Sequence, residues 1–449
     1  MSTAPTPAKP ASASGAIVPP QQALADWMRH DYDELAASVA SASAAQWERH
    51  NCRACLAGGL TEILDLGEMP PANSLLKPED VSKPEPRFPL SLRLCTNCGM
   101  VQLGHVVPPS LLFRSYLFFT SMSRVMSEHF SNLMAHCSDE FVKPGGLVVE
   151  IGSNDGTGLS SIRRRDVRIL GVDPARNVAV MAASRGVPTV SEFFNQPLAH
   201  EIARVAGPAH LIVACNVLGH INDLDDVCRG IQTLIARDGA LVVEVPYLGD
   251  LLDRAEYDTI YHEHLSYFAV RPMAALLNRH GLRLERVEHF AVHGGTIRCT
   301  AIQGDGVSPQ VQTWIDKENK ANLSHPSAYE AFAKKVVQER AGLRQKLADF
   351  KARGLKVIGY GAPAKGTVVL NYCGIGVDLL PAVIDSTPAK QGWHVPGTHQ
   401  PILPPLEMER QKPDVLLLLA WNHAQEIMER ESAFRARGGK FITPHLQEL

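Results

Sequence analysis

The stretch Val148-Val149-Glu150-Ile151-Gly152-Ser153-Asn154-Asp155-Gly156 decides the fold of this chain. Its first half is an apolar run typical of a buried strand, and its second half is a glycine-rich turn. Further apolar runs alternate with helical stretches, which predicts a parallel, doubly wound α/β sheet. Strands are expected at 147–151, 168–172, 209–215 and 240–245, with helices at 178–185 and 224–235 and a late strand at 296–302.

The glycine-rich turn also predicts a cofactor site. Gly152 and Gly156 let a ligand approach the backbone, but their spacing is not the G-x-G-x-x-G of dinucleotide sites, so NAD is not favoured. Asp173 ends the next strand, where an acid commonly binds ribose hydroxyls. This pairing fits an adenosyl ligand without pyrophosphate, namely S-adenosylmethionine, and the alternative is a purely structural turn. The predicted cofactor-binding residues are Glu150, Gly152, Asn154, Asp155, Gly156, Asp173, Asn216 and His220.

A second informative stretch is Tyr261-His262-Glu263-His264-Leu265-Ser266-Tyr267-Phe268. A histidine near neutral pH can remove a C–H proton, and a neighbouring carboxylate or phenol can orient it or stabilise the enolate that forms. Together with the cofactor turn, this cluster predicts a methyltransferase. A satisfied polar loop and a metal-binding pair are the alternatives, and the metal pair ranks low because no third ligand is obvious.

Four of the nine cysteines form two Cys-x-x-Cys pairs, Cys52/Cys55 and Cys95/Cys98, separated by 39 residues. Four thiolates suit a tetrahedral, structural zinc ion, and the alternative is unrelated thiols or one redox pair. The surrounding residues 51–103 are rich in Pro and Gly, and we expect short strands at most and no independent core. The other cysteines are scattered singly, which indicates a reducing cytoplasm rather than a disulfide-bonded secreted protein.

A second α/β unit is expected near the C-terminus, after a helical connector at 311–353. Its strands are predicted at 356–359, 380–384 and 415–419. The turn Gly359-Tyr360-Gly361-Ala362-Pro363-Ala364-Lys365-Gly366 leads into a helix whose N-terminus, with Lys365, could hold a phosphate. A purely structural turn is an equally open alternative.

Composition excludes several classes of protein. The net charge of −3 on 449 residues comes without a basic tract, so nucleic acid is not the expected partner. No apolar run reaches membrane-spanning length, so we expect no membrane association. Residues 1–20 are predicted to be a disordered tail rather than a signal peptide, and the spacing of apolar residues over 21–50 is helical.

These motifs, in this order, resemble the zinc-containing, S-adenosylmethionine-dependent sugar C-methyltransferases, which build branched deoxysugars on nucleotide diphosphates. The resemblance covers residues 50–445 and includes blocks at 66–73, 95–103, 244–247, 258–268, 293–298 and 371–374. It implies a domain order of an extension at 1–50, a zinc-binding module at 51–112, a Rossmann-like class I methyltransferase domain at 113–305, a helical connector at 306–353 and a Rossmann-like, substrate-binding α/β domain at 354–449.

The resemblance also implies a substrate, a 4-keto-6-deoxyhexose nucleotide that is usually dTDP-linked and is methylated at C3 through an enolate. By motif position, His264 would be the base, and Tyr261 and Glu263 would assist it. The implied substrate-binding residues are Tyr116, His262, Tyr267 and Lys365.

One departure from the family concerns Tyr116-Leu117-Phe118, where the family has Tyr-x-Tyr. Phe118 cannot donate the hydrogen bond of the second phenol. This difference keeps another enolisable ketone or a hydroxyl open as the acceptor. A non-catalytic, zinc-scaffolded binding protein is a third hypothesis, against which the intact cofactor turn and Tyr-His-Glu-His cluster both argue.

Overall fold

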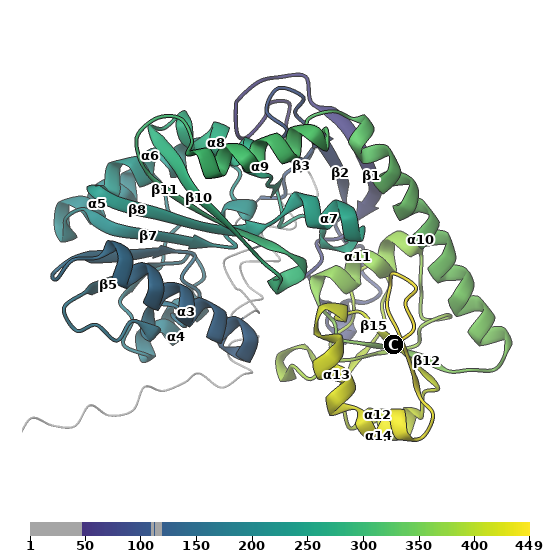
Figure 1. Ribbon diagram of the computed structural model, residues 1–449. Coiled ribbons are helices and arrows are strands. Elements are labelled where there is room, and N and C mark those ends of the chain that lie inside the picture. The colour runs from purple at the N-terminus through teal and green to yellow at the C-terminus, as the bar shows by residue number, and fades with distance from the viewer. Residues whose placement is uncertain (1–46, 109–111, 113–118) are drawn as a thin grey trace, which may run out of the picture.

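The computed structural model describes residues 47–108, 112 and 119–449, and the predicted N-terminal tail and helix and Tyr116 lie outside this part of the chain. The described residues form three sheets of four, seven and five strands. In Figure 1 the seven-stranded sheet lies on the left, strands β1–β3 lie above the centre and the five-stranded sheet lies at the lower right. The long helix α10 (Ser327–Ala352) runs along the right-hand edge.

The seven-stranded sheet has the order β10-β11-β8-β7-β4-β5-β6. Its parallel strands are β4 (Leu147–Ile151), β5 (Arg168–Val172), β6 (Thr189–Val190), β7 (Ala209–Cys215) and β8 (Ile235–Pro246). The expectation of a parallel sheet needs one correction, because β10 (Leu282–Phe290) and β11 (Thr296–Gln303) form an antiparallel hairpin that extends the sheet beyond β8.

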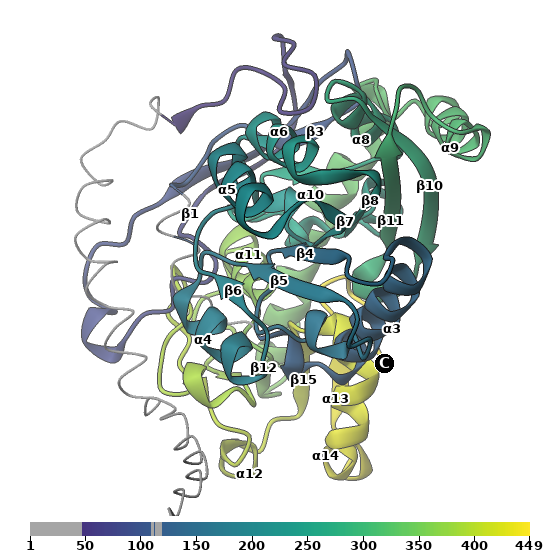
Figure 2. The same cartoon turned by 90° about the vertical axis from the view of Figure 1, so that its left-hand side faces the viewer.

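Helices cover both faces of this sheet, as a doubly wound fold requires. Val149 belongs to a core that includes residues of α5 (Gln196–Ala206) and α6 (Leu224–Leu234). Its neighbour Val148 belongs to a second core with residues of α3 (Arg124–Phe141) and α4 (Arg176–Ser184). Successive residues of β4 therefore point to opposite, equally dry faces. Figure 2 shows these helices around the sheet from the side.

The four-stranded sheet joins the cysteine-bearing segment to the methyltransferase part of the chain. Its order is β1 (Thr61–Met69), β2 (Phe88–Leu94), β3 (Val101–Leu103) and β9 (Ser266–Tyr267). The expectation of short strands was wrong, because β1 has nine residues and β2 has seven. Leu90, Leu92 and Leu94 are buried in a core shared with the seven-stranded sheet, and this shared core is what stabilises the long strands.

The C-terminal sheet is parallel throughout and has the order β14-β13-β12-β15-β16. Its strands are β12 (Val357–Tyr360), β13 (Val383–Ile384), β14 (Ile402–Leu403), β15 (Val415–Leu418) and β16 (Lys440–Ile442). The remaining helices are α7 (Leu248–Arg254), α8 (Val270–Asn278), α9 (Pro309–Lys320), α11 (Ala364–Cys373), α12 (Glu407–Gln411), α13 (Ala424–Arg430) and α14 (Ser432–Ala436). Among the described residues, no helix is both long and apolar enough to cross a membrane.

Candidate active site

A cavity of about 1500 Å³ lies where the three sheets meet. Residues between β1 and β2 line one wall, and the loops after β4, β5, β7 and β8 line a second. The third wall comes from the C-terminal unit, at the start of α11 and after β13 and β15. The cavity thus collects the carboxyl ends of two parallel sheets, which is where α/β folds bind their ligands.

The loops after β4 and β5 form one end of the cavity. Gly152 has a φ of +71°, and a Cβ there would lie 2.9 Å from Val217, so glycine is required at this position. The Asp173 carboxylate accepts hydrogen bonds from the backbone N–H groups of Asn154 (2.8 Å) and Ala175 (2.9 Å). Burial raises the pKa of Asp173. Each carboxylate oxygen keeps a lone pair that can accept a hydrogen bond from a hydroxyl group of a ligand in the cavity.

The predicted cofactor residues divide into two groups. Those that line the cavity are Gly152, Asn154, Asp173, Asn216 and His220, whereas Glu150, Asp155 and Gly156 do not line it. Asp155 is fully buried and pairs with Arg185 at 3.1 Å. Burial raises the pKa of Glu150 to about 8. Both acids are therefore buried outside the cavity.

His264 is held in one tautomer by the backbone. Its Nδ1 lies 2.7 Å from the carbonyl oxygen of Thr259, which can only accept a hydrogen bond, so Nδ1 carries the proton. Nε2 is therefore the basic atom of the neutral ring. The ring of Tyr261 lies 3.9 Å from that of His264, centroid to centroid, and the ring of His220 lies 5.0 Å from it. All four residues line the cavity.

Glu263 is buried beside His264 and also lines the cavity. Burial raises its pKa to about 7, against the opposing effect of a 2.6 Å hydrogen bond from the amide of Asn73. Asn73 lies after β1 and was not predicted as a site residue. The motif at 66–73 is part of the family resemblance. The sequence does not indicate that Asn73 contacts Glu263, which lies 190 positions later in the chain.

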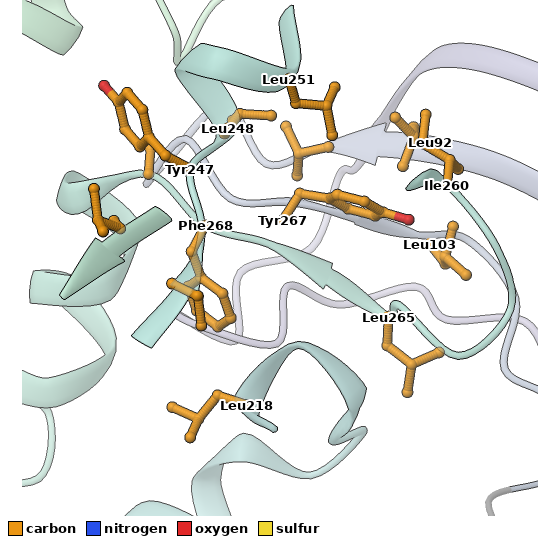
Figure 3. Packing of buried hydrophobic residues seen from close by; sticks show 14 of the residues in the cluster. Leu92, Leu103, Leu218, Tyr247, Leu248, Leu251, Ile260, Leu265, Tyr267 and Phe268 are labelled. Carbon is orange, nitrogen blue, oxygen red and sulfur yellow. The ribbon is translucent and has the colours of Figure 1, made fainter. Parts of the chain in front are cut away.

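His262 and Tyr267 differ in their placement relative to the cavity. His262 lies away from the cavity, where its Nε2 is 3.2 Å from the carbonyl oxygen of Phe88 and burial lowers its pKa to about 4. Tyr267 lines the cavity from β9, and Figure 3 shows its ring among the buried side chains around Leu103 and Ile260. Burial raises the pKa of Tyr267.

Lys365 lies in the first turn of α11 and lines the cavity from the C-terminal unit. Its ammonium sits over the ring of Trp421, 4.4 Å from the ring centroid, and no carboxylate of the described residues lies within ion-pair distance. Lys390 and Arg430 line the same wall. This end of the cavity can therefore hold an anionic group.

The four predicted metal ligands come together. The sulfur atoms of Cys52, Cys55, Cys95 and Cys98 all lie within 4.8 Å of one another. The Cys52–Cys98 and Cys55–Cys95 sulfur distances are 3.5 and 3.6 Å. Tetrahedral zinc with bonds of about 2.3 Å places its sulfurs about 3.8 Å apart, so the arrangement fits zinc. Four thiolates leave no position for a reactive water, which fits a structural role.

Comparison with known proteins agrees with this arrangement. Three family models match in order: a zinc binding domain at residues 52–113, a methyltransferase domain at 123–287 and a C-methyltransferase C-terminal domain at 291–445. The chain is 38% identical over 397 residues to C-methyltransferase NovU of Streptomyces niveus. The aligned residues make up 88% of this chain and 94% of NovU. The chain belongs to this family of C-methyltransferases. This C-methyltransferase uses S-adenosylmethionine as its cofactor and binds structural zinc through its four clustered cysteines.

Two solved methyltransferase structures match part of the chain. Magnesium protoporphyrin IX methyltransferase from Synechocystis is 12% identical, covers 40% of this chain and 79% of its own, and has a TM-score of 0.30. N-methyltransferase NodS from Bradyrhizobium japonicum is 13% identical, with coverages of 40% and 96% and a TM-score of 0.31.

Proposed function

We propose that this enzyme methylates a carbon beside the ketone of a nucleotide-linked 4-keto-6-deoxysugar, at C3, through an enolate. The observation that carries the proposal is the fixed tautomer of His264, which presents a basic nitrogen in the cavity that Asp173 and Lys365 also line. The cavity thus combines a proton acceptor, an acid placed for ribose hydroxyls and a cation placed for phosphate.

The first step of the proposal is proton removal. A C–H bond beside a ketone is weakly acidic, so the base must act while the developing charge on the carbonyl oxygen is stabilised. His264 accepts the proton at Nε2, and the charge that forms on its ring is stabilised by the bond from Nδ1 to the carbonyl oxygen of Thr259. Bound S-adenosylmethionine supplies an electrophilic methyl group for the carbon nucleophile.

Tyr261 and Glu263 are the groups proposed to meet the enolate oxygen. A phenol donates a hydrogen bond at neutral pH, because its proton is lost only in strongly basic solution. The pKa of Glu263 is raised to about 7 by burial, so a sizeable fraction of this carboxyl is protonated near neutral pH and can donate as well. Both side chains line the cavity beside His264.

The C-terminal unit is proposed to bind the nucleotide part of the substrate. A sugar diphosphate carries negative charge that the wall formed by Lys365, Lys390 and Arg430 can offset. The first turn of α11 adds backbone N–H groups to Lys365, and both favour phosphate.

The test is a panel of dTDP-, GDP- and CDP-linked keto-sugars, with simple ketones and hydroxyl compounds as competing acceptors. NMR of the product locates the new methyl group at C3 or at C5, the two carbons beside a C4 ketone. We expect methyl transfer to C3 of a 4-keto-6-deoxysugar nucleotide. Transfer only to another ketone or to an oxygen would overturn the proposal, and transfer to C5 would correct the carbon.

A further inference from the structure

We propose that Asn73, from the zinc-binding module, is a positioning residue of the active site that holds Glu263 Oε1 and so leaves proton exchange to Glu263 Oε2. The inference deepens the proposed function and rests on the role given there to Glu263. It starts from the 2.6 Å hydrogen bond that Asn73 Nδ2 donates to Glu263 Oε1. Asn73 and Glu263 both line the cavity.

The chemistry of the two groups decides what this bond does. An amide N–H can only donate, so the oxygen that it contacts must act as an acceptor. A proton on the Glu263 carboxyl is then best placed on Oε2. The neighbouring His264 is controlled in the same way, because its Nδ1 is committed to Thr259 and its Nε2 is left as the basic atom.

The position of Asn73 is set from the C-terminal unit. The carbonyl oxygen of the preceding residue, Ala72, accepts a buried 2.9 Å hydrogen bond from Thr367 on α11, the helix that also carries Lys365. Farther along the same segment, between β1 and β2, Glu85 accepts hydrogen bonds from the backbone N–H of Gly397. The segment that contains Asn73 is thus hydrogen-bonded to the C-terminal unit, on the helix that carries the proposed phosphate ligand Lys365.

Few other titratable groups surround Glu263. The titratable side chains of its own segment are Tyr261, His262, His264 and Tyr267. The ring of His220 contacts the backbone of Glu263 from the turn after β7. Burial lowers the pKa of both His262 and His220 to about 4, so both are neutral at pH 7. The donated bond from Asn73 is therefore the main polar contact that favours the carboxylate form of Glu263.

The first test measures Glu263 directly in the full-length, zinc-loaded protein without substrate. Glutamate labelled at 13Cδ is titrated by NMR, and the Glu263 signal is the one that Glu263→Gln lacks. Asn73→Ala should raise the titration midpoint of Glu263 by about one pH unit, because the carboxylate loses a donor. A matched control is His399→Asn, because His399 does not line the cavity. This variant removes the 2.6 Å contact between His399 and Glu85, which lies on the same segment as Asn73, and should leave the midpoint unchanged.

The second test asks whether Asn73 acts through Glu263. Asn73→Ala should lower kcat about tenfold with little change in the affinity for S-adenosylmethionine, and it should have no further effect in the Glu263→Gln background. Asn73→Ser, with a shorter donor, replaces the alanine variant if that variant does not fold. An unchanged Glu263 midpoint, or an equal loss of kcat in both backgrounds, would overturn the inference. Failure of the wild type to methylate any keto-sugar would overturn the proposed substrate instead, and the titration would still decide the role of Asn73.

Discussion

The indole N–H of Trp421 donates a 2.6 Å hydrogen bond to the carboxylate of Asp258. Asp258 is fully buried and lies six positions before His264, whereas Trp421 follows β15 of the C-terminal sheet and supports the Lys365 ammonium on its ring. This bond therefore joins the segment that carries the proposed base to the indole ring that contacts Lys365. It belongs to the interface through which the two α/β units pack together around the cavity.

Replacing Trp421 with Phe should destabilise that interface. The phenyl ring still offers a face to Lys365, but the buried Asp258 carboxylate loses a charge-assisted donor. We expect a loss of about 1–3 kcal/mol in stability, seen as a lower midpoint of thermal unfolding. Trp393→Phe is the matched control, because no described group accepts from its indole N–H. Equal midpoints for the two variants would show that the Asp258 bond contributes nothing.

The same interface should depend on pH through His445. Burial alone would lower the pKa of this imidazole, but its 2.9 Å hydrogen bond with Glu339 and the charge of Asp258 outweigh burial and raise the pKa above its ordinary value. A raised pKa in the folded state means that the contribution to stability is complete below the unfolded pKa of about 6.5 and is lost as the pH rises through the folded value.

The corresponding variant is His445→Gln, which keeps a polar side chain but cannot become charged. Its deficit in unfolding midpoint relative to the wild type should be largest near pH 6 and should shrink toward pH 9. Thermal unfolding followed by circular dichroism at several pH values measures this difference. A deficit that stays constant over the whole range would exclude a charged His445 at the interface.

Zinc should be required for stability and, through β9, for activity. Strand β9 begins two residues after His264 and pairs with β3 of the zinc-binding module, with Tyr267 opposite Val101. We expect about one zinc per chain, and Cys95→Ser should lose most of it together with several kcal/mol of stability. Cys137→Ala, at a buried cysteine of α3 outside the cluster, should keep its zinc. Less than about a tenth of an equivalent in the pure wild type would contradict a zinc site.

The parts of the fold that were predictable are those with a local pattern. Strands β4 and β5 were expected with their observed limits, since parallel strands buried on both faces are short apolar runs. Strand β10 was missed because its alternation, as in Leu282-Arg283-Leu284, does not persist. A register shift between Leu284 and Arg286 breaks the pattern, so that Val287 is the next residue in the core. The long β1 was missed because its burial depends on the neighbouring sheet rather than on its own sequence.

The site shows the same division. The composition of the Tyr261–Phe268 stretch indicates its chemistry. It does not indicate which of its side chains line the cavity. His262 and His264 would share a face on a strand, but residues 261–265 form a turn and coil, and His262 lies away from the cavity. Asn73, Thr259 and Trp421 act through contacts between distant or irregular segments, and no periodicity in the sequence marks such contacts.

Cofactor affinity should distinguish the two acids beside the glycine-rich loop. Asp173→Asn should weaken binding of S-adenosylmethionine by about one to two orders of magnitude, because the ribose hydroxyls lose a charged acceptor that lines the cavity. Asp155→Asn should lower the unfolding midpoint but change the affinity by less than about threefold, because Asp155 pairs with Arg185 outside the cavity. Titration calorimetry compares the two variants, and equal losses of affinity would place Asp155 in contact with the cofactor.

The role of His264 is best tested with asparagine. Asparagine places its amide nitrogen near the position of Nδ1, so His264→Asn can still donate to the carbonyl oxygen of Thr259 while it lacks the basic Nε2. The variant should therefore fold and bind S-adenosylmethionine as the wild type does, while turnover falls by about two to four orders of magnitude. Exchange of the proton beside the substrate ketone with deuterated water, measured by NMR without the cofactor, should stop as well. Near wild-type methylation by His264→Asn would remove His264 from the chemical step and leave Tyr261 and Glu263 as the groups in the cavity to test next.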